Sequence, residues 1–147
     1  MNIRQANIDD LDDLVRFNQQ MAMETEHKVL ENSVLEQGVS ELIKDSSKGF
    51  YLVAVQDKQV VGSLMVTTEW SDWRNGTFWW VQSVYILPQN RRQGIYTSLY
   101  DAVKNLAANN KNVCGFRLYV EKDNLAAQQT YKKLGMLESH YLMFEEL

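Results

Sequence analysis

Hydrophobic positions recur along this chain with two periods, one typical of helices and the other typical of strands. A period near 3.6 residues begins after Asn7 or Asp9 and dissolves at residues 23–27. It returns after Ser33, which has a glutamate three residues later at the spacing of a capping box, and it ends at residues 46–49. The first third of the chain therefore predicts two amphipathic helices with an irregular segment between them.

Segments rich in β-branched and aromatic residues surround these two helices. Residues 1–5 predict a short strand before the first helix. Residues 50–56 and 59–70 are joined by a tight turn, so they predict a β-hairpin. Residues 77–87 predict a third long strand, which ends at the only proline, Pro88.

Beyond this proline the helical and strand patterns alternate. Residues 95–107 carry one clean helical stripe, and residues 113–121 predict a strand. Residues 124–135 predict a short helix closed by a glycine, and one or two strands are expected from residue 136 onward. The chain therefore predicts one α/β domain over residues 1–147. Its mixed, mostly antiparallel sheet is flanked by about four helices and contains a central strand–helix–strand crossover.

The composition is that of an ordinary globular protein. Hydrophobic residues make up 45% of the chain and charged residues 23%. No apolar run is long enough to cross a bilayer, and the N-terminus lacks the pattern of a secretory signal. The single cysteine, Cys114, allows no internal disulfide and no structural zinc cluster, and its apolar strand neighbours make it a poor nucleophile. We therefore expect a cytoplasmic protein with no metal and no membrane partner.

The formal net charge of −4 disfavours nucleic-acid binding, and the pair Arg91 and Arg92 is a local exception to it. The pair lies in a turn that contains Gly94 and leads from a strand into a helix. The first N–H groups of a helix have no internal partner and lie at the positive end of its dipole, so this turn suits phosphate. The alternative, that two arginines merely occupy a surface turn, stays open at this point.

The run from Val84 to Leu99 resembles the acetyl-CoA-binding motif of the GNAT N-acetyltransferase superfamily. In that family a strand ending in proline precedes a turn of the form Arg/Gln-x-x-Gly-x-Gly/Ala. Arg91, Gly94 and Tyr96 stand at those three positions, so the third carries a tyrosine instead of a small residue. A tyrosine can still offer its N–H to a ligand if its side chain points away.

A second stretch resembles the same family. There an asparagine opens a helix that carries a tyrosine and ends in Gly-Phe or Gly-Met, and Asn124, Tyr131, Gly135 and Met136 match this signature. The order of predicted elements agrees with the family over essentially the whole chain. The resemblance implies an enzyme that uses acetyl-CoA as co-substrate.

The resemblance also implies a set of cofactor contacts. Backbone N–H groups after the conserved arginine would hold the pyrophosphate, helped by the guanidinium groups of Arg91 and Arg92 if these face the ligand. Backbone groups of the preceding strand would pair with the pantetheine arm, and one could polarise the thioester carbonyl. Asn124 would contact the cofactor as well as cap its helix. The pyrophosphate residues implied are Arg92, Gln93, Gly94, Ile95, Tyr96 and Thr97, and the strand residues are Val84, Tyr85 and Ile86.

Tyr131 matches the general acid of the family, which protonates the departing thiolate; the alternative is simple packing on the sheet. Some relatives place a carboxylate base on the strand before the turn, but residues 77–87 contain no acid, and Trp80 stands at that position. Glu24 and Glu26 are the best alternative bases and acceptor contacts, although both also fit a solvated helix end.

Other side chains are weaker candidates for the acceptor site. Gln82 shares a strand face with Trp80 and could line an acceptor pocket with it. His27 could act as a base, although a lone histidine beside two glutamates is more often a surface residue. An aromatic wall is another option, against the alternative of core packing. Its members would be Trp70, Trp73, Trp79 and Trp80.

The expected reaction is acetyl transfer from acetyl-CoA to a primary amine by direct attack in a ternary complex. Glu24 and Glu26 favour a cationic small molecule such as a polyamine or an amino sugar, and a peptide N-terminus or lysine remains open. Two rival functions are a non-catalytic acyl-CoA sensor or scaffold and a transferase with a different acyl-CoA. The resemblance also allows a homodimer through exposed sheet edges.

Overall fold

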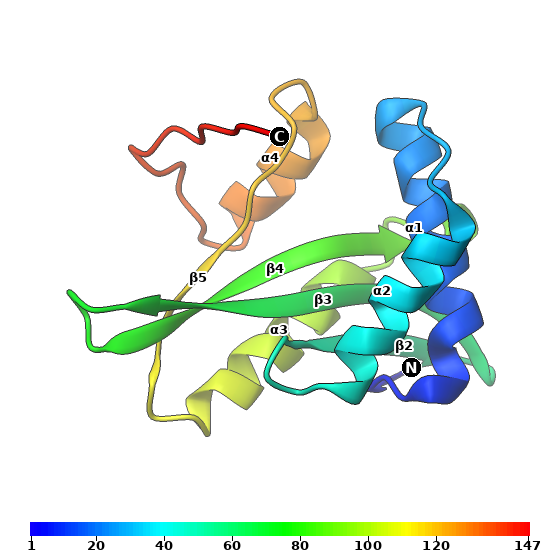
Figure 1. The fold of residues 1–147 in the computed structure, drawn as a ribbon, viewed down its shortest axis with the longest axis horizontal. Helices are drawn as coiled ribbons and strands as arrows, with labels where there is room; N and C mark the ends of the chain where they lie inside the picture. The colour runs from blue at the N-terminus through cyan, green and yellow to red at the C-terminus, as the bar shows by residue number, and fades with distance from the viewer.

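The alternating segments assemble into one sheet with the strand order β1-β2-β3-β4-β5 (Figure 1). The computed structural model describes residues 1–147, and its strands are β1 (Asn2–Gln5), β2 (Phe50–Gln56), β3 (Gln59–Ser71), β4 (Gly76–Ile86) and β5 (Val113–Arg117). Neighbouring strands from β1 to β4 run antiparallel, whereas β4 and β5 run parallel. The sheet is therefore mixed and mostly antiparallel, as the sequence predicted.

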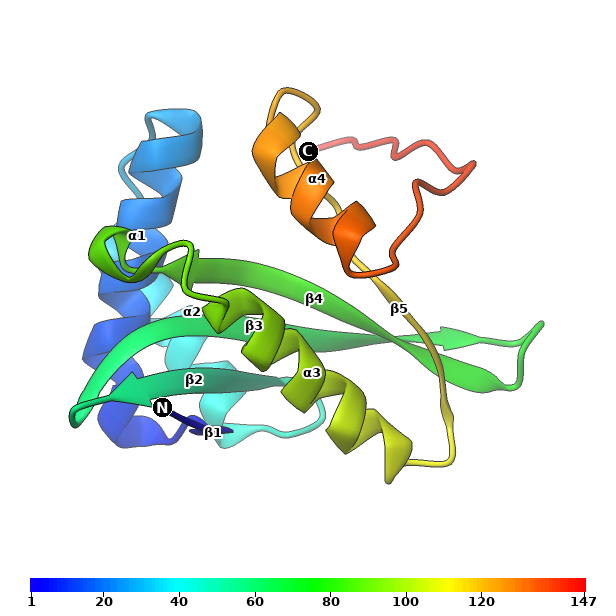
Figure 2. The ribbon, with the colours of Figure 1, turned by 180° about the vertical axis from the view of Figure 1, so that it is seen from behind.

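Helices cover both faces of this sheet. α1 (Leu11–Glu26) and α2 (Asn32–Lys44) lie on one face, and α3 (Ile95–Ala108), the crossover from β4 to β5, lies on the other (Figures 1 and 2). α4 (Leu125–Lys133) follows β5 and contributes no buried side chain. Four helices around a five-stranded sheet confirm the predicted α/β fold.

Alternation along β2 separates two hydrophobic cores. Leu52 and Ala54 belong to the core under α3, whereas Tyr51 and Val53 belong to the core under α1 and α2. A central strand covered on both faces needs a continuous apolar run, which is what β2 has.

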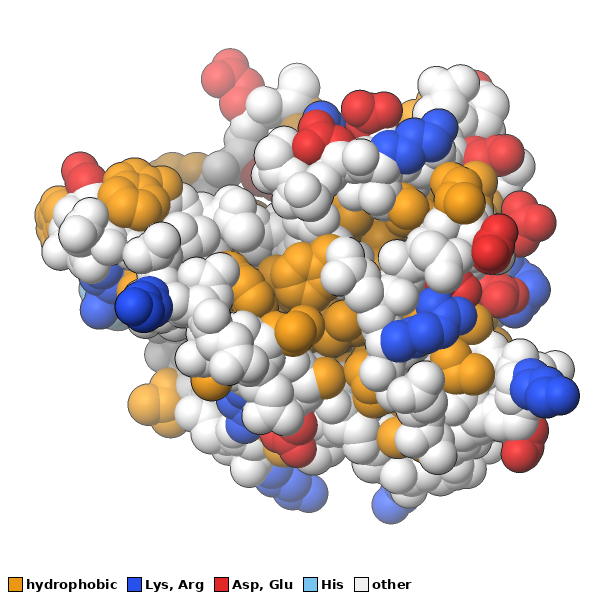
Figure 3. All heavy atoms as spheres, turned by 90° about the horizontal axis from the view of Figure 1, so that it is seen from below, with side chains coloured by type: hydrophobic (Ala, Val, Ile, Leu, Met, Phe, Trp, Pro, Cys, Tyr) orange, Lys and Arg blue, Asp and Glu red, His pale blue; other side chains and the backbone are white.

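Figure 3 shows the molecule from below relative to Figure 1. On this face hydrophobic side chains are exposed in the middle, and charged side chains lie mainly around the rim.

The hairpin between β2 and β3 has the expected two-residue turn. Asp57 and Lys58 have φ angles of 48° and 64°. Two consecutive positive φ angles are typical of a type I′ turn, whose twist matches that of the flanking strands. The predicted hairpin is confirmed.

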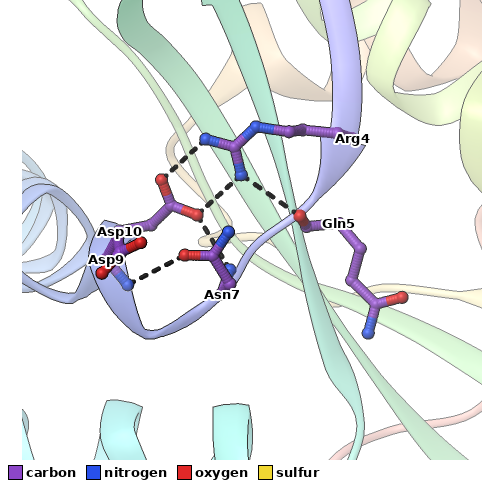
Figure 4. A network of polar contacts seen from close by, with 5 residues as sticks. All are labelled: Arg4, Gln5, Asn7, Asp9 and Asp10. Atoms are coloured by element: carbon purple, nitrogen blue, oxygen red, sulfur yellow. Dashed lines mark hydrogen bonds and ion pairs between the residues drawn. The ribbon is translucent and has the colours of Figure 1, made fainter.

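A polar network joins the end of β1 to the start of α1 (Figure 4). Arg4 donates to both carboxylate oxygens of Asp10, over 2.8 and 2.9 Å. Asp10 also accepts the backbone N–H of Asn7, whose side chain accepts the N–H of Asp9, so Asn7 and Asp10 form a capping box. Asp10 is buried, and the hydrogen bond from Arg4 lowers the pKa of its carboxyl below its usual value.

Two expectations for the helices were wrong. Ser33 does not cap α2, which begins at Asn32; its hydroxyl donates to the carboxylate of Glu31 instead. The segment expected to be irregular is helical, because α1 continues to Glu26. His27 ends the helix with a φ of 52°, and its N–H bonds to the carbonyls of Ala22 and Met23.

The C-terminal part of the chain also differs from expectation. β5 ends at Arg117 instead of residue 121, and residues 136–147 form no strand. Both ribbon views show α4 and the final residues to one side of the sheet (Figures 1 and 2). A strand needs a neighbouring strand for its backbone hydrogen bonds, and neither segment has one.

Two further observations concern the whole chain. None of its helices combines the length and the apolar character needed to cross a membrane. No three or more histidine, cysteine, aspartate or glutamate side chains come together as a group that could hold a metal ion.

Candidate active site

The site is built where β4 separates from β5. The two strands pair only from Thr77–Val113 to Trp80–Arg117, and β4 then continues alone on that side to Ile86. A β-bulge follows the last pair: Met65 faces Gln82 and Ser63 faces Tyr85 across the ladder with β3, and Ser83 has a φ of 49°. Bulges bend a strand and increase its twist, so this one helps to turn β4 away from β5.

The separated part of β4 exposes backbone groups on its open side. Leu87 donates to the carbonyl of Val61 on β3, so its backbone faces β3. Backbone groups alternate along an antiparallel strand, and those of Tyr85 therefore also face β3, whereas those of Val84 and Ile86 face the open side. Arg91 Nε donates to the carbonyl of Ile86 over 2.9 Å, in agreement with this direction. Of the three residues expected to pair with an extended ligand, two present their backbone for it.

The turn after β4 presents a row of free donors. Pro88–Asn90 forms one 3₁₀ turn, and α3 then begins at Ile95 with no side-chain cap. Arg92 and Gly94 have φ angles of 63° and 78°, which fold the backbone tightly before the helix. The consecutive N–H groups from Arg92 to Thr97 bond to no acceptor in the protein. Such donors at the positive end of a helix form an anion-binding site.

Gly94 lies at the exposed centre of this turn. An added Cβ there would meet no atom within 4 Å, so it would project into open space. Its left-handed φ is one that glycine adopts without strain. The glycine therefore allows the backbone to make this turn without strain.

Arg91 connects this turn to α1. Its NH2 nitrogen donates to Glu24 Oε2 over 2.8 Å, and its guanidinium lies 5.3 Å from the ring centre of Tyr85. The hydroxyl of Tyr85 donates to the other carboxylate oxygen of Glu24, also over 2.8 Å. Burial raises the pKa of Tyr85, and the Glu24 carboxylate adds to the increase. One carboxylate thus joins the turn before α3, the end of β4 and the last turn of α1.

A cavity of about 750 Å³ opens beside this carboxylate. Its lining includes Glu24, Lys28 and Tyr85, together with Met23 and the start of the turn at Leu87. Glu26 does not line it, because residues two apart on a helix point in different directions. Glu24 therefore lines the cavity and Glu26 does not, a difference that the sequence alone could not show. His27, the third candidate of this segment, ends α1.

Tyr131, on α4, lies against the first turn of α3. Its ring packs edge-on against Tyr96 in the first turn of α3, with ring centres 5.6 Å apart. Burial raises the pKa of the Tyr131 hydroxyl above its ordinary value. Asn124 caps α4 by accepting the N–H of Ala127. The contact between Tyr131 and Tyr96 thus joins the α4 segment that resembles the second family motif to the turn that resembles the first.

Tyr96 turns its side chain away from the donors of its own backbone. The ring is stacked on Tyr100 at 6.1 Å and supports Tyr131 on its other side. Its hydroxyl is buried without a hydrogen-bond partner. The tyrosine that replaces a small residue in the motif therefore packs within the protein and leaves its N–H free.

The tryptophans do not form one wall. Trp79 is buried in the core under α3, whereas Trp73 is almost fully exposed at the tip of the β3–β4 hairpin. Trp80 donates to Glu69, and its ring lies 6.2 Å from that of Tyr119 at the point where β4 leaves β5. Gln82 donates from its side-chain amide nitrogen to the hydroxyl of Thr67 on the same sheet face, so this amide group already has a partner within the protein.

Sequence analysis missed two parts of the site. Glu69 accepts hydrogen bonds from both Trp80 and Arg117, and these lower the pKa of its carboxyl. The contact of Glu24 with Tyr85 and Arg91 joins residues 61 and 67 positions apart. Local sequence pattern carries no signal for either contact.

Comparison with known proteins places this geometry in a family. The model of the acetyltransferase (GNAT) family matches residues 13–136. An N-alpha-acetyltransferase of Saccharolobus solfataricus is 29% identical over 142 residues, which are 90% of this chain and 78% of that protein.

Solved structures agree with this assignment. A possible acetyltransferase from Clostridium difficile 630 superposes with a TM-score of 0.93 and 46% identity, covering 99% of this chain and 96% of the other. A predicted acetyltransferase from Clostridium acetobutylicum, solved with acetyl-CoA, has the same fold at a TM-score of 0.81 and 19% identity, covering 98% and 95% of the two chains. The chain belongs to the GNAT family of acetyltransferases.

Proposed function

We propose that this protein transfers the acetyl group of acetyl-CoA to a primary amine of a small molecule or peptide within a ternary complex. The amine lone pair attacks the thioester carbon, and the carbon–sulfur bond then breaks. The amine loses a proton to a base, and the CoA thiolate gains one from an acid. The products are an acetylated amine and free CoA.

One observation carries this proposal: the row of free N–H donors from Arg92 to Thr97 beside the open edge of β4. A diphosphate would accept these donors, as anions do at helix N-termini. An extended pantetheine arm would pair with the open-side backbone of Val84 and Ile86, as an added strand does. The Clostridium acetobutylicum protein of the same fold, solved with acetyl-CoA, supports this choice of donor.

Arg91 would change partner when the cofactor binds. In this structure its guanidinium pairs with Glu24, and both side chains are partly exposed. A surface ion pair of this kind is worth less than about 1 kcal/mol, so a diphosphate can displace the carboxylate at little cost. Displacement would leave Glu24 Oε2 free beside the cavity.

We assign Tyr131 the role of acid and Glu24 the role of base or acceptor contact. Tyr131 keeps its proton at neutral pH, as an ordinary phenol does, and burial raises its pKa further. A phenol can donate that proton to a thiolate. Glu24 is the carboxylate of the two candidates that lines the cavity. A carboxylate there would attract a protonated amine and take up its proton. The name of the Saccharolobus solfataricus relative, an N-alpha-acetyltransferase, supports an α-amino group among the acceptors to be tested.

The experiment is a thiol-release assay with acetyl-CoA and a panel of polyamines, amino sugars, lysine peptides and peptide N-termini. We expect release with at least one class of amine, and at least about a tenfold loss of kcat/KM for Glu24→Gln. Glu26→Gln is the matched control, because Glu26 lies on the same helix outside the cavity, and it should keep full activity.

Three outcomes would overturn parts of the proposal. Acetyl-CoA binding without thiol release for any amine would favour a sensor or scaffold. Faster release from a longer acyl-CoA would change the donor. Equal losses in the two glutamate variants would remove the role given to Glu24.

A further inference from the structure

A second carboxylate lies near the proposed site and has no role in the proposed reaction. Glu69 on β3 accepts hydrogen bonds from the indole of Trp80 and from Arg117, each over 2.9 Å, and both donors bond to the same oxygen, Oε1. No hydrogen bond or ion pair within the protein uses the other oxygen, Oε2. The side chain of Glu69 is 45% exposed, against 30% for Arg117. Glu69 therefore presents an oriented and unpaired carboxylate oxygen to solvent.

An aromatic pair adjoins this carboxylate. The ring of Trp80 bonds to Glu69 through its N–H edge, and its centre lies 6.2 Å from that of Tyr119, with 54° between the ring planes. Tyr119 is exposed. Aromatic faces attract cations, and they pack well against methylene groups. A free carboxylate oxygen beside two such rings suits an alkylammonium group, and we call Glu69, Trp80 and Tyr119 the Glu69 cluster.

Arg117 fixes the carboxylate from one side. In the ladder between β4 and β5, Arg117 stands opposite Trp80, but its guanidinium carbon lies 3.6 Å from the ring centre of Phe78. Phe78 precedes Trp80 on β4, so the guanidinium extends toward the β3–β4 hairpin and away from the open edge of β4. The ring of Tyr141 lies 5.8 Å from the same guanidinium. The positive charge of Arg117 is thus held among aromatic rings on the hairpin side of the cluster.

The Glu69 cluster lies on the same sheet face as Glu24. Met65, Thr67 and Glu69 alternate onto one face of β3, and Met65 packs against the core under α1 and α2. Toward their hairpin, β3 and β4 extend beyond these two helices, which leaves this part of the face without a helix over it (Figure 1). An acceptor that lies along this face can therefore contact Glu24 at one end and the cluster at the other.

The open strand sets the distance between the two carboxylates. Glu24 bonds to Tyr85, the residue after Val84, whereas Glu69 bonds to Trp80, which precedes Val84 on the same strand. At about 3.3 Å per residue, Trp80 lies at most roughly 13 Å along the strand from Val84. The thioester would lie near Val84 if the pantetheine arm pairs there. Only an extended acceptor can then place one nitrogen at the thioester and another group at the cluster.

We propose that the Glu69 cluster binds a second ammonium group of the acceptor, which makes the acceptor an extended diamine or polyamine. The distal ammonium donates to Glu69 Oε2, and the methylene chain lies over the ring of Trp80. This distal group keeps its charge and takes no part in the chemistry; only the amine at the thioester is acetylated. The inference rests on the proposed acetyl transfer and narrows its acceptor from any primary amine to one with two separated positive charges.

The first test measures binding and needs no turnover. 1,8-Diaminooctane, 8-aminooctan-1-ol and 8-aminooctanoic acid have the same carbon chain length and differ in the distal group, which is an ammonium, a hydroxyl or a carboxylate. In calorimetric titrations with excess CoA present, we expect the diamine to bind at least about tenfold more tightly than the alcohol, and the acid to bind most weakly. Absence of diamine binding, equal affinities, or tightest binding of the acid through Arg117 would overturn the inference.

Glu69→Gln tests whether this preference comes from the cluster. Glutamine has the same shape and can still accept the N–H of Trp80, but it carries no negative charge. The variant should raise Kd and KM for the diamine at least about tenfold and leave those for the alcohol and for acetyl-CoA unchanged. Glu41→Gln is the matched control, because Glu41 lies on α2 and pairs with Lys48, and it should change none of these values. An equal loss for diamine and alcohol would indicate a structural role and overturn the inference.

The same ligands separate this inference from the proposed function. Thiol release from acetyl-CoA with the alcohol as efficient as with the diamine would leave acetyl transfer in place and overturn the second ammonium site. Tight diamine binding that depends on Glu69, without thiol release for any amine, would support the ammonium site and overturn acetyl transfer. Release that favours the diamine, with the preference lost in Glu69→Gln, is the result that both proposals predict.

Discussion

The two ends of this chain differ in how firmly they are packed. Every buried side chain lies between Asp10 and Ala107, and none lies in β5, α4 or residues 137–147. The proposed donor site, the end of β4 and the start of α3, belongs to the packed part. Tyr131 belongs to the other part and reaches the site through its contact with Tyr96. The protein thus holds its proposed cofactor turn on a packed frame and its proposed acid on a helix with no buried side chain.

This difference bears on how stability and function are distributed. Elements with few buried contacts open with lower free energies than core elements, and catalytic parts that move are drawn from them. Changes in the core should therefore alter stability, changes on α4 should alter turnover, and few single changes should alter both. The following predictions test that division, beginning with the largest effect.

A core deletion in α3 should have the largest effect on folding. Leu99 is fully buried under the sheet, so Leu99→Ala leaves a cavity and should lower the free energy of unfolding by about 3 kcal/mol. Leu125→Ala on α4 is the control; its side chain is exposed, and the change should stay within about 0.5 kcal/mol. Urea denaturation measures both, and similar losses would contradict the division into two regions.

Tyr131→Phe should show the opposite profile. Loss of the proposed proton donor should lower kcat about 100-fold, while acetyl-CoA affinity and the free energy of unfolding change little. Steady-state kinetics, calorimetry and urea denaturation on one preparation separate these effects. Unchanged turnover at saturating substrate would remove Tyr131 from the mechanism and leave the fold assignment intact.

Asp10→Asn should destabilise the packed part by about 2 kcal/mol, because it breaks a buried, charge-assisted hydrogen-bond pair with Arg4. The pKa of Asp10 is lowered in the folded protein, so the unfolded chain binds its proton at a higher pH. Its stabilisation is therefore present above the usual aspartate pKa of about 3.9 and is lost as the pH falls through the lowered value. The variant should lose this part of the acid dependence. An unchanged acid profile in urea denaturation would contradict the assignment.

The smallest predicted effect is a gain. The hydroxyl of Tyr96 is buried without a partner, so Tyr96→Phe should stabilise the protein by about 1 kcal/mol. Tyr119→Phe, whose side chain is exposed beyond β5, should leave stability unchanged. Thermal unfolding of the two variants measures the difference. A destabilised Tyr96→Phe would show that this hydroxyl has a partner in solution.

The sequence was most informative where structure depends on neighbouring residues. The β2–β3 hairpin follows from two strand segments around a two-residue turn, and the turn before α3 follows from a strand, a proline and a glycine. The contact of Glu24 with Tyr85 and Arg91 could not be predicted, because it depends on how α1 lies across the end of β4. The length of β5 could not be predicted either, because a strand pattern does not show whether a partner strand is present.

The central claim, that acetyl-CoA is held by the N–H donors at the start of α3, is tested most directly by two glycine variants. Gly94 and Gly135 both have left-handed φ angles, and a Cβ on either would meet no atom within 4 Å. Gly94→Ala and Gly135→Ala therefore impose similar backbone strain, but only the first lies within the row of free N–H donors. Calorimetric titration with acetyl-CoA should show binding weakened at least about tenfold by Gly94→Ala and unchanged by Gly135→Ala. Full affinity in the Gly94 variant, or an equal loss in both, would contradict the account.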